Sequence, residues 1–163
     1  MLFRSDAIWC RDVLNHVDLP RGFAEGARVL KPGGSLLIYV TLVMEQCEPR
    51  EAARLWEALA IVPENMERDY FERCARSAGF EIAAVDAIDS EWREHAIESG
   101  DQWGELKALL QIARMRRREE ELVQRHGRNV YEAAYAGELW GIYQLLGKLC
   151  PMVYRLRKRS SPQ

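Results

Sequence analysis

The amino-acid sequence predicts an α/β fold, and three observations carry that prediction. Apolar segments at residues 6–10 and 35–42 have the length of buried β-strands, and a helical pattern lies between them. This strand, helix and strand take about 35 residues, the size of a right-handed crossover that joins two parallel strands. The chain has 163 residues, of which 48% are hydrophobic and 29% charged. That composition is typical of one globular domain.

The first predicted strand, Asp6-Ala7-Ile8-Trp9-Cys10, is apolar on both faces, so we expect helices to cover it on both sides. Pro20 suits the first turn of the helix that follows, whose apolar positions are Phe23, Ala24, Ala27 and Leu30. The segment Lys31-Pro32-Gly33-Gly34 predicts a sharp end to this helix, because proline cannot continue it and glycine suits a left-handed cap.

Further helices and strands are predicted along the rest of the chain. We expect helices at residues 51–61 and 67–78, then a strand at 80–88. Two long helical patterns follow at 105–126 and 130–146, and a last strand lies at 152–156. The spacing of Leu106, Leu109, Leu110 and Ala113 predicts that this stripe is the buried face of its helix.

Composition excludes several classes of protein. No apolar run approaches the roughly 20 residues that cross a bilayer, so we expect a cytoplasmic protein without a membrane partner. The four cysteines lie far apart and form no Cys-x-x-Cys pair, which argues against a disulfide framework or a zinc site. We therefore expect no metal.

Basic clusters at residues 114–118 and 155–159 raise the alternative of a nucleic-acid partner, which a salt-sensitive shift with oligonucleotide would reveal. The chain as a whole carries 23 Lys and Arg against 25 Asp and Glu, for a net charge of −2. Arg116 and Arg117 also lie one helical turn before Glu120 and Glu121 and can pair with them. We therefore favour solvated surface charge over nucleic-acid binding.

Two stretches of the sequence resemble a known family. They are Asp6 to Val17, with the pattern Asp-Ala-Ile-Trp-Cys-Arg-Asp-Val-Leu-Asn-His-Val, and Glu25 to Ile38, with Glu-x-x-Arg-Val-Leu-Lys-Pro-Gly-Gly-Ser-Leu-Leu-Ile. Both look like the central part of a class I S-adenosylmethionine-dependent methyltransferase. That Rossmann-like fold has seven strands in the order 3-2-1-4-5-7-6. The resemblance implies that residues 6–11, 35–42, 80–88 and 152–156 are strands four, five, six and seven. Residues 1–163 would then be one partial domain, with residues 90–146 as a helical insertion or lid.

The resemblance also implies that part of the fold is missing. The Gly-rich turn after strand one and the acidic residue that ends strand two, which hold the cofactor in this family, have no counterpart here. We therefore expect a C-terminal portion of such an enzyme. Without strand one, the edge of strand 6–11 is exposed, which invites either the missing N-terminal half or a second copy of the chain.

Candidate site residues follow from the resemblance. Cys10 and Arg11 would contact the methionine part of S-adenosylmethionine. Asp12, Asn15 and His16 would line the junction with the substrate. His16, with an ordinary pKa of about 6.5, would act as base, and Asp12 would hold a cationic amine. The alternatives are that His16 orients the loop and that Asp12 caps the turn after it.

Further candidates lie at the end of strand five and in the lid. Tyr39 and Thr41 would contact the substrate. Aromatic side chains of the lid would form cation–π contacts with an acceptor, or would simply pack in a core: Trp92, Trp103, Tyr135, Trp140 and Tyr143. The sequence thus predicts a methyltransferase that acts on a small molecule with S-adenosylmethionine. The alternative is a non-catalytic half-domain that pairs with or regulates a methyltransferase partner.

Overall fold

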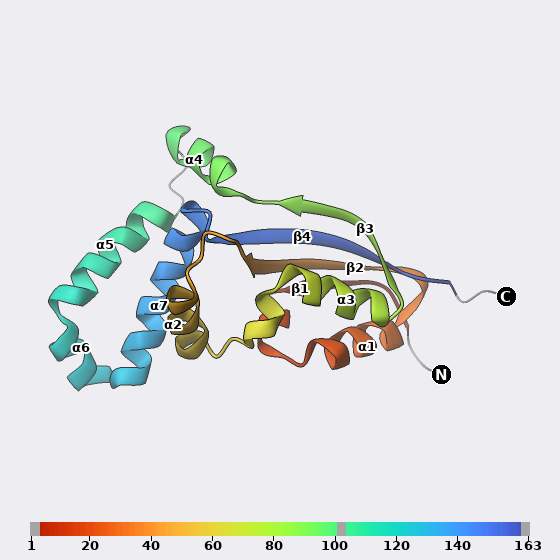
Figure 1. The fold of residues 1–163 in the computed structure, drawn as a ribbon, viewed down its shortest axis with the longest axis horizontal. Coiled ribbons are helices and arrows are strands. Elements are labelled where there is room, and N and C mark those ends of the chain that lie inside the picture. Colours follow the sequence, from red (N-terminus) through yellow and green to blue (C-terminus); the bar gives the residue numbers. More distant parts are fainter. Residues whose placement is uncertain (1–3, 101–103, 161–163) are drawn as a thin grey trace. The chain divides into compact units, whose positions relative to one another are not determined.

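The computed structural model describes residues 4–100 and 104–160 (Figure 1). Four strands of the described chain form one sheet in the order β1-β2-β4-β3. Strands β1 (Ser5–Arg11) and β2 (Leu30–Val43) are parallel, whereas β3 (Phe80–Ala87) and β4 (Leu149–Lys158) are antiparallel. This is the predicted order of strands four, five, seven and six, so the α/β class and the partial sheet are confirmed.

The chain divides into two compact units. Unit 1 comprises residues 1–42, 62–87 and 151–163, and unit 2 comprises residues 43–61 and 88–150. Unit 2 contains the whole of residues 90–146 but also takes in 43–61. The interpretation of 90–146 as an insertion or lid within a single domain stays a prediction.

Two helices of unit 1, α1 (Leu19–Val29) and α3 (Arg68–Ser77), cover one face of the sheet (Figure 1). Helix α1 begins where the Asp18 side chain accepts a hydrogen bond from the Arg21 amide at 2.9 Å, an N-cap that satisfies a free donor of the first turn. Phe23 of α1, Phe71 of α3 and Phe80 of β3 pack together in the core between these helices and the sheet. The centre of the Phe23 ring lies 5.2 Å from that of Phe71 and 6.1 Å from that of Phe80. All three are fully buried.

Strand β1 is the edge of the sheet among the described residues. The face of the sheet that lies opposite α1 and α3 carries no described helix of unit 1. Trp9 is 56% exposed, and Leu37, its neighbour in the register, is 39% exposed. The expectation that β1 is covered on both faces is therefore wrong. The physical reason is that both helices of unit 1 lie on the face of Leu36 and Ile38. The exposed edge itself agrees with the prediction.

The segment Lys31-Pro32-Gly33-Gly34 does not form a helix cap. Helix α1 ends at Val29 and β2 begins at Leu30, so the segment bulges from the strand: Ser5 pairs with Leu30 but Ala7 pairs with Ser35. Gly33 has a φ of +75°, which favours glycine. A Cβ on Gly34 would lie 2.9 and 3.0 Å from two backbone carbonyl oxygens. These glycines allow β2 to pass close to β1.

Unit 2 is helical and is organised around α7 (Arg128–Leu145), which contacts the four other long helices of the unit. These are α2 (Pro49–Leu59), α4 (Ser90–Glu98), α5 (Gly104–Arg117) and α6 (Glu119–His126). The helix predicted at 105–126 is thus two helices that meet at Arg118. Helix α4 was not predicted, and the Asp89 side chain caps it by accepting a hydrogen bond from the Trp92 amide at 3.0 Å.

The predicted buried stripe of α5 is on the solvent side. Leu106, Leu109 and Leu110 are each more than half exposed, whereas Ala108 and Ile112 are buried. Ile112 packs in a cluster with Tyr131 and Tyr135 of α7. Helix α5 is apolar on both sides, so the helical period alone could not decide which side faces α7.

Candidate functional site

The candidate site is the loop that leaves β1 at the carboxyl ends of β1 and β2. Asp12, the first residue after the strand, has a φ of +51°, a left-handed conformation that aspartate tolerates better than most residues. Its backbone N–H donates a hydrogen bond to the Tyr39 carbonyl oxygen at 3.0 Å. The turn at Asp12 therefore ties the loop after β1 to Tyr39 of β2, near the edge of the sheet where ligands of open α/β folds bind.

Arg11, Asp12 and Tyr39 lie together on this edge. The Arg11 guanidinium carbon is 5.4 Å from the centre of the Tyr39 ring, and Arg11 Nε is 3.4 Å from Asp12 Oδ2. The Arg11 and Asp12 side chains are both largely exposed. Because both side chains are exposed, both charges are accessible to a ligand, and their pairing adds little to stability.

Cys10 is half-buried in β1, in register with Ile38. Burial raises the pKa of the Cys10 thiol above its ordinary value, and the nearby Asp12 carboxylate acts in the same direction. The thiol is therefore protonated at neutral pH, which argues against a nucleophilic role.

Asn15 and Thr41 are brought together, but both are buried. The Asn15 amide nitrogen donates to the Thr41 carbonyl oxygen at 2.9 Å and lies 2.9 Å from the Met66 sulfur. The Asn15 carbonyl oxygen accepts a hydrogen bond from the Val62 amide at 2.9 Å. This geometry supports a bracing role. Contact between these two side chains and a substrate stays a prediction.

Asn65 is a site residue that the sequence reasoning missed. It is buried in the short 3₁₀ helix Pro63–Met66, and its amide nitrogen donates to the carbonyl oxygens of Leu14 and Val17 at 2.8 and 2.7 Å. Its partners lie about fifty residues away in the chain, so no local pattern could have identified it. Asn15 thus ties the loop to β2, and Asn65 ties it to the 3₁₀ helix Pro63–Met66.

His16 is exposed at the end of the short 3₁₀ helix Leu14–His16, and its backbone N–H donates to the Val13 carbonyl oxygen at 3.0 Å. The structure therefore places His16 on the same braced loop as Asp12.

Two of the aromatic candidates of unit 2 pack against other rings. Trp140 lies 6.1 Å from Trp56, and Tyr135 is stacked on Tyr131 at 6.0 Å. Burial raises the pKa of the Tyr143 hydroxyl. Trp92 is partly exposed, and Trp103 lies outside the described residues. These contacts support the alternative of core packing for Trp140 and Tyr135.

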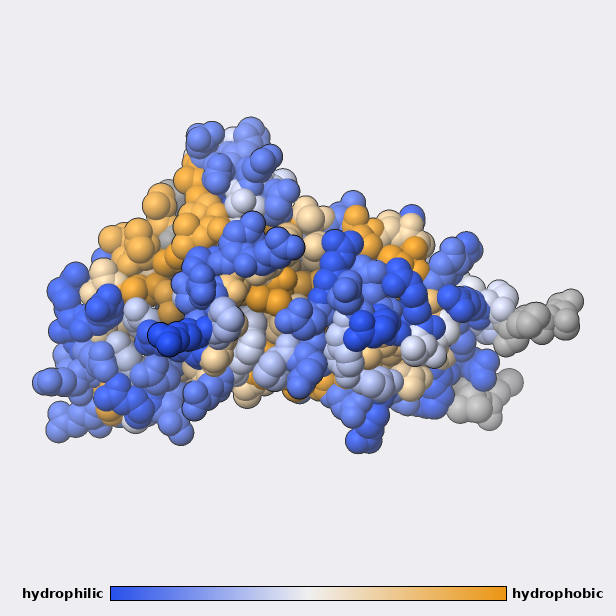
Figure 2. All heavy atoms as spheres, in the orientation of Figure 1, coloured by the Kyte–Doolittle hydropathy of each residue, from blue (hydrophilic) through white to orange (hydrophobic). Residues whose placement is uncertain are grey.

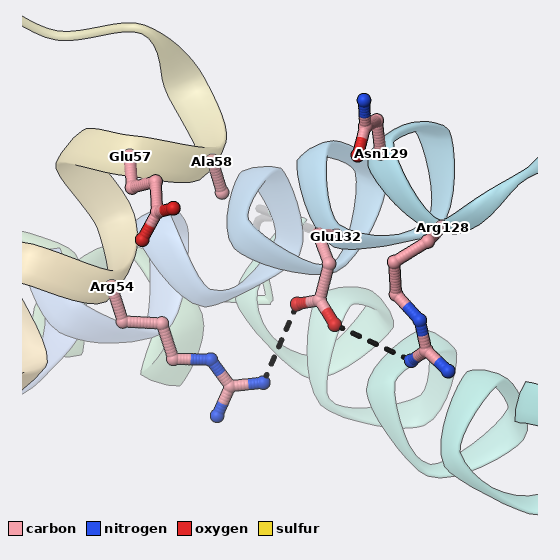
Figure 3. Close-up of a pocket in the computed structure, with 6 residues that line it drawn as sticks. All are labelled: Arg54, Glu57, Ala58, Arg128, Asn129 and Glu132. Carbon is pink, nitrogen blue, oxygen red and sulfur yellow. Dashed lines mark ion pairs between the residues drawn. The ribbon is translucent and has the colours of Figure 1, made fainter.

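A polar cavity of about 570 Å³ lies between α2 and α7 of unit 2 (Figure 3). Glu132 stands between two cations there: its carboxylate is 3.7 Å from Arg54 and 3.6 Å from Arg128. The Arg54 guanidinium also lies 5.0 Å from the centre of the Tyr135 ring. Both arginines of the cavity are thus paired with Glu132.

The described residues offer neither a metal site nor a membrane span. No group of three His, Cys, Asp or Glu side chains in that part of the chain is placed to hold a metal ion. Nor does any helix in it have the length and apolar character needed to span a membrane.

The similarity of this chain to a known protein family lies in its N-terminal segment. The family model described as "Methyltransferase domain" matches residues 4–38, the segment that contains β1, the loop and the start of β2. No curated protein sequence matches the chain significantly.

Solved structures share the fold over nearly the whole chain. One is a protein from Galdieria sulphuraria assigned as a sarcosine dimethylglycine methyltransferase, with 18% identity, a TM-score of 0.62, and coverage of 96% of this chain and 54% of that one. The cyclase SpnF has 19% identity, a TM-score of 0.61, and coverage of 98% and 51%.

A third is Haemonchus contortus phosphoethanolamine N-methyltransferase 2, in complex with phosphomonomethylethanolamine and S-adenosylhomocysteine. It has 16% identity, a TM-score of 0.58, and coverage of 96% and 34%. This chain thus spans about half the length of the first two structures and a third of the last. The resemblance to class I S-adenosylmethionine-dependent methyltransferases is confirmed.

Proposed function

We propose that this chain, which resembles the class I S-adenosylmethionine-dependent methyltransferases, is the C-terminal portion of such an enzyme and acts on a small molecule. The observation that carries the proposal is the braced loop 12–17 at the carboxyl ends of two parallel strands. Ligands of open α/β sheets bind at this edge. The segment matched by the methyltransferase family model contains this loop.

In the proposed site, backbone atoms of Cys10 and Arg11 contact the methionine end of S-adenosylmethionine. Transfer of its methyl group needs an acceptor atom in line with the sulfonium, and an amine or hydroxyl acceptor must also lose a proton. We assign that proton to the exposed imidazole of His16 and assign attraction of a cationic amine to Asp12. The Tyr39 ring lies beside them, and the hydrogen bond from Asn15 to Thr41 holds the loop against β2.

Photolabelling tests cofactor binding directly. The chain is irradiated with S-adenosylmethionine carrying a tritiated methyl group, digested with trypsin, and the labelled peptide is sequenced. We expect the label in peptide 5–11 or peptide 12–21, and we expect excess S-adenosylhomocysteine to abolish it. Absence of label, or label elsewhere that the competitor does not remove, would contradict the proposal.

The base is tested with the same labelled cofactor and small amine or hydroxyl acceptors. His16→Gln should lower the rate of methyl transfer, whereas His126→Gln should not, because His126 lies at the exposed end of α6. Equal effects of the two variants would remove His16 from the proposed mechanism.

A second candidate function is a non-catalytic half-domain that pairs through β1. The observation that favours it is the exposed apolar pair of Trp9 and Leu37 beside an open strand edge. A similar fold in the cyclase SpnF also indicates that this fold does not by itself fix the reaction. This candidate predicts no photolabel and a chain that associates with itself or a partner. Trp9→Lys should weaken that association, as measured by sedimentation velocity.

A further inference from the structure

Helix α5 carries an apolar stripe that no described element of unit 2 covers. Leu106, Leu109 and Leu110 are more than half exposed, and Ala113 is exposed with them. These positions follow the i, i+3, i+4, i+7 spacing that places residues on one side of a helix. The opposite side of α5 is occupied, because Ala108 and Ile112 are buried. Figure 2 shows hydrophobic atoms gathered over α5.

Basic residues border this stripe. Lys107 and Arg114 stand two helical turns apart along one border, Arg116 stands on the other, and Arg117 continues the line of the leucines. From Leu106 to Arg118 the sequence has five basic residues and no acidic one. Lys107, Arg114 and Arg117 form no ion pair with any residue that the structure describes. Their charges are therefore open to an external anion.

A row of leucines between exposed cations has the chemistry of a helix that lies in a bilayer interface. Its leucines would enter the boundary of the acyl chains, while the long basic side chains would reach the phosphates of the headgroups. The sequence predicted no membrane partner because no run is long enough to cross a bilayer. A helix that lies on the surface needs no such run.

We propose that α5 binds the surface of a membrane that contains anionic lipids, with Leu106, Leu109 and Leu110 in the interface. This goes beyond the proposed methyl transfer and does not depend on it. The whole chain carries a net charge of −2, so attraction to an anionic surface must come from the local cluster on α5 rather than from the overall charge.

Vesicle co-sedimentation tests the proposal. The full chain is mixed with vesicles of phosphatidylcholine alone, or with about one-third phosphatidylglycerol. We expect binding only to the anionic vesicles. The double variant Leu109→Gln/Leu110→Gln should weaken it about tenfold or more. Lys107→Gln/Arg114→Gln should weaken it by a similar factor, and more salt should weaken binding of the unaltered chain.

Matched controls keep the outcome specific. Val130→Gln/Leu146→Gln removes two equally exposed apolar side chains of unit 2 that lie outside α5, and Arg125→Gln removes an exposed charge of α6. Both controls should bind like the unaltered chain.

Several results would overturn the proposal: no preference for anionic vesicles, equal losses in the controls, or leucine variants that unfold. The last result would mean that the stripe is buried. If instead the leucine variants convert a dimer to a monomer in sedimentation velocity, a second copy of the chain covers the stripe and the membrane assignment is wrong.

Discussion

The Nδ2 atom of Asn65 lies 2.7 Å from the carbonyl oxygen of Val17, although 48 residues separate the two in the chain. The same nitrogen lies 2.8 Å from the Leu14 carbonyl oxygen. One buried side chain thus satisfies two backbone acceptors of the loop that carries Asp12 and His16. The loop owes its shape to a distant residue as much as to its own sequence.

Replacement of Asn65 by leucine should lower the free energy of unfolding by about 2–4 kcal/mol, because two backbone acceptors lose their donor inside the protein. Urea unfolding followed by circular dichroism measures this change. As a control, Asn129→Leu on the exposed start of α7 should change the free energy by about 0.5 kcal/mol or less. Equal effects in both variants would mean that the Asn65 hydrogen bonds do not hold the loop.

Substitutions of Asp12 test whether the turn after β1 is left-handed. Asp12→Gly should leave the free energy of unfolding unchanged or raise it slightly, because glycine adopts a φ of +51° without strain. Asp12→Val should lower it by about 1–2 kcal/mol, because a β-branched residue is strained there. Asp86→Val in β3 is the matched control and should be nearly neutral. If valine is tolerated equally at both positions, the turn at Asp12 is not left-handed.

Replacement by alanine should change the free energy of unfolding in opposite directions at two glycines. Gly34→Ala should lower the free energy of unfolding by about 1–3 kcal/mol, since its methyl group would meet backbone carbonyl oxygens of Lys31 and Asp6. Gly137→Ala should raise it by about 1 kcal/mol, because the residue lies inside α7 with open space around it. A stable Gly34→Ala variant would contradict the bulge between β1 and β2.

The pH dependence of stability should contain a contribution from Glu72. Burial raises the pKa of the Glu72 carboxyl, but hydrogen bonds from Arg68 and Arg76 outweigh burial and leave this pKa below its ordinary value. A carboxyl of this kind stabilises the protein above its unfolded pKa of about 4.3, and the contribution is lost as the pH falls through the lower folded pKa.

Thermal unfolding of Glu72→Gln at a series of pH values measures this contribution. The variant should be less stable than the unaltered chain at pH 7, and the difference should close as the pH falls below about 4. Glu81→Gln, which alters an exposed residue of β3, should show no such convergence. A constant difference at every pH would show that the charge of Glu72 does not stabilise the fold.

The sheet was predictable because its signals are local. Strand β2 is an apolar run that follows a helix end, and β3 is one that follows Gly79. The family resemblance supplied the strand order. The segment at 31–34 was misread because proline and glycine suit both a helix cap and a bulge. Only the register with β1 distinguishes the two.

The candidate site was only partly predictable. Asp12 follows β1 directly and His16 lies on the same short loop, so their place near the strand end could be read from the sequence. The burial of Asn15 and the role of Asn65 depend on contacts with residues far along the chain. The face of α5 was also misassigned, since both of its sides are apolar and the packing of α7 selects one.

The most direct test of the central claim is an NMR titration of the isotope-labelled chain with S-adenosylhomocysteine. If the loop after β1 holds the methionine end of the cofactor, amide signals of Cys10, Arg11, Asp12 and His16 should shift, with a dissociation constant of about 1 mM or tighter. Signals of α6 and α7 should stay unchanged. A folded chain whose loop signals do not move, or whose shifts lie elsewhere, would contradict the assignment of this loop as a cofactor site.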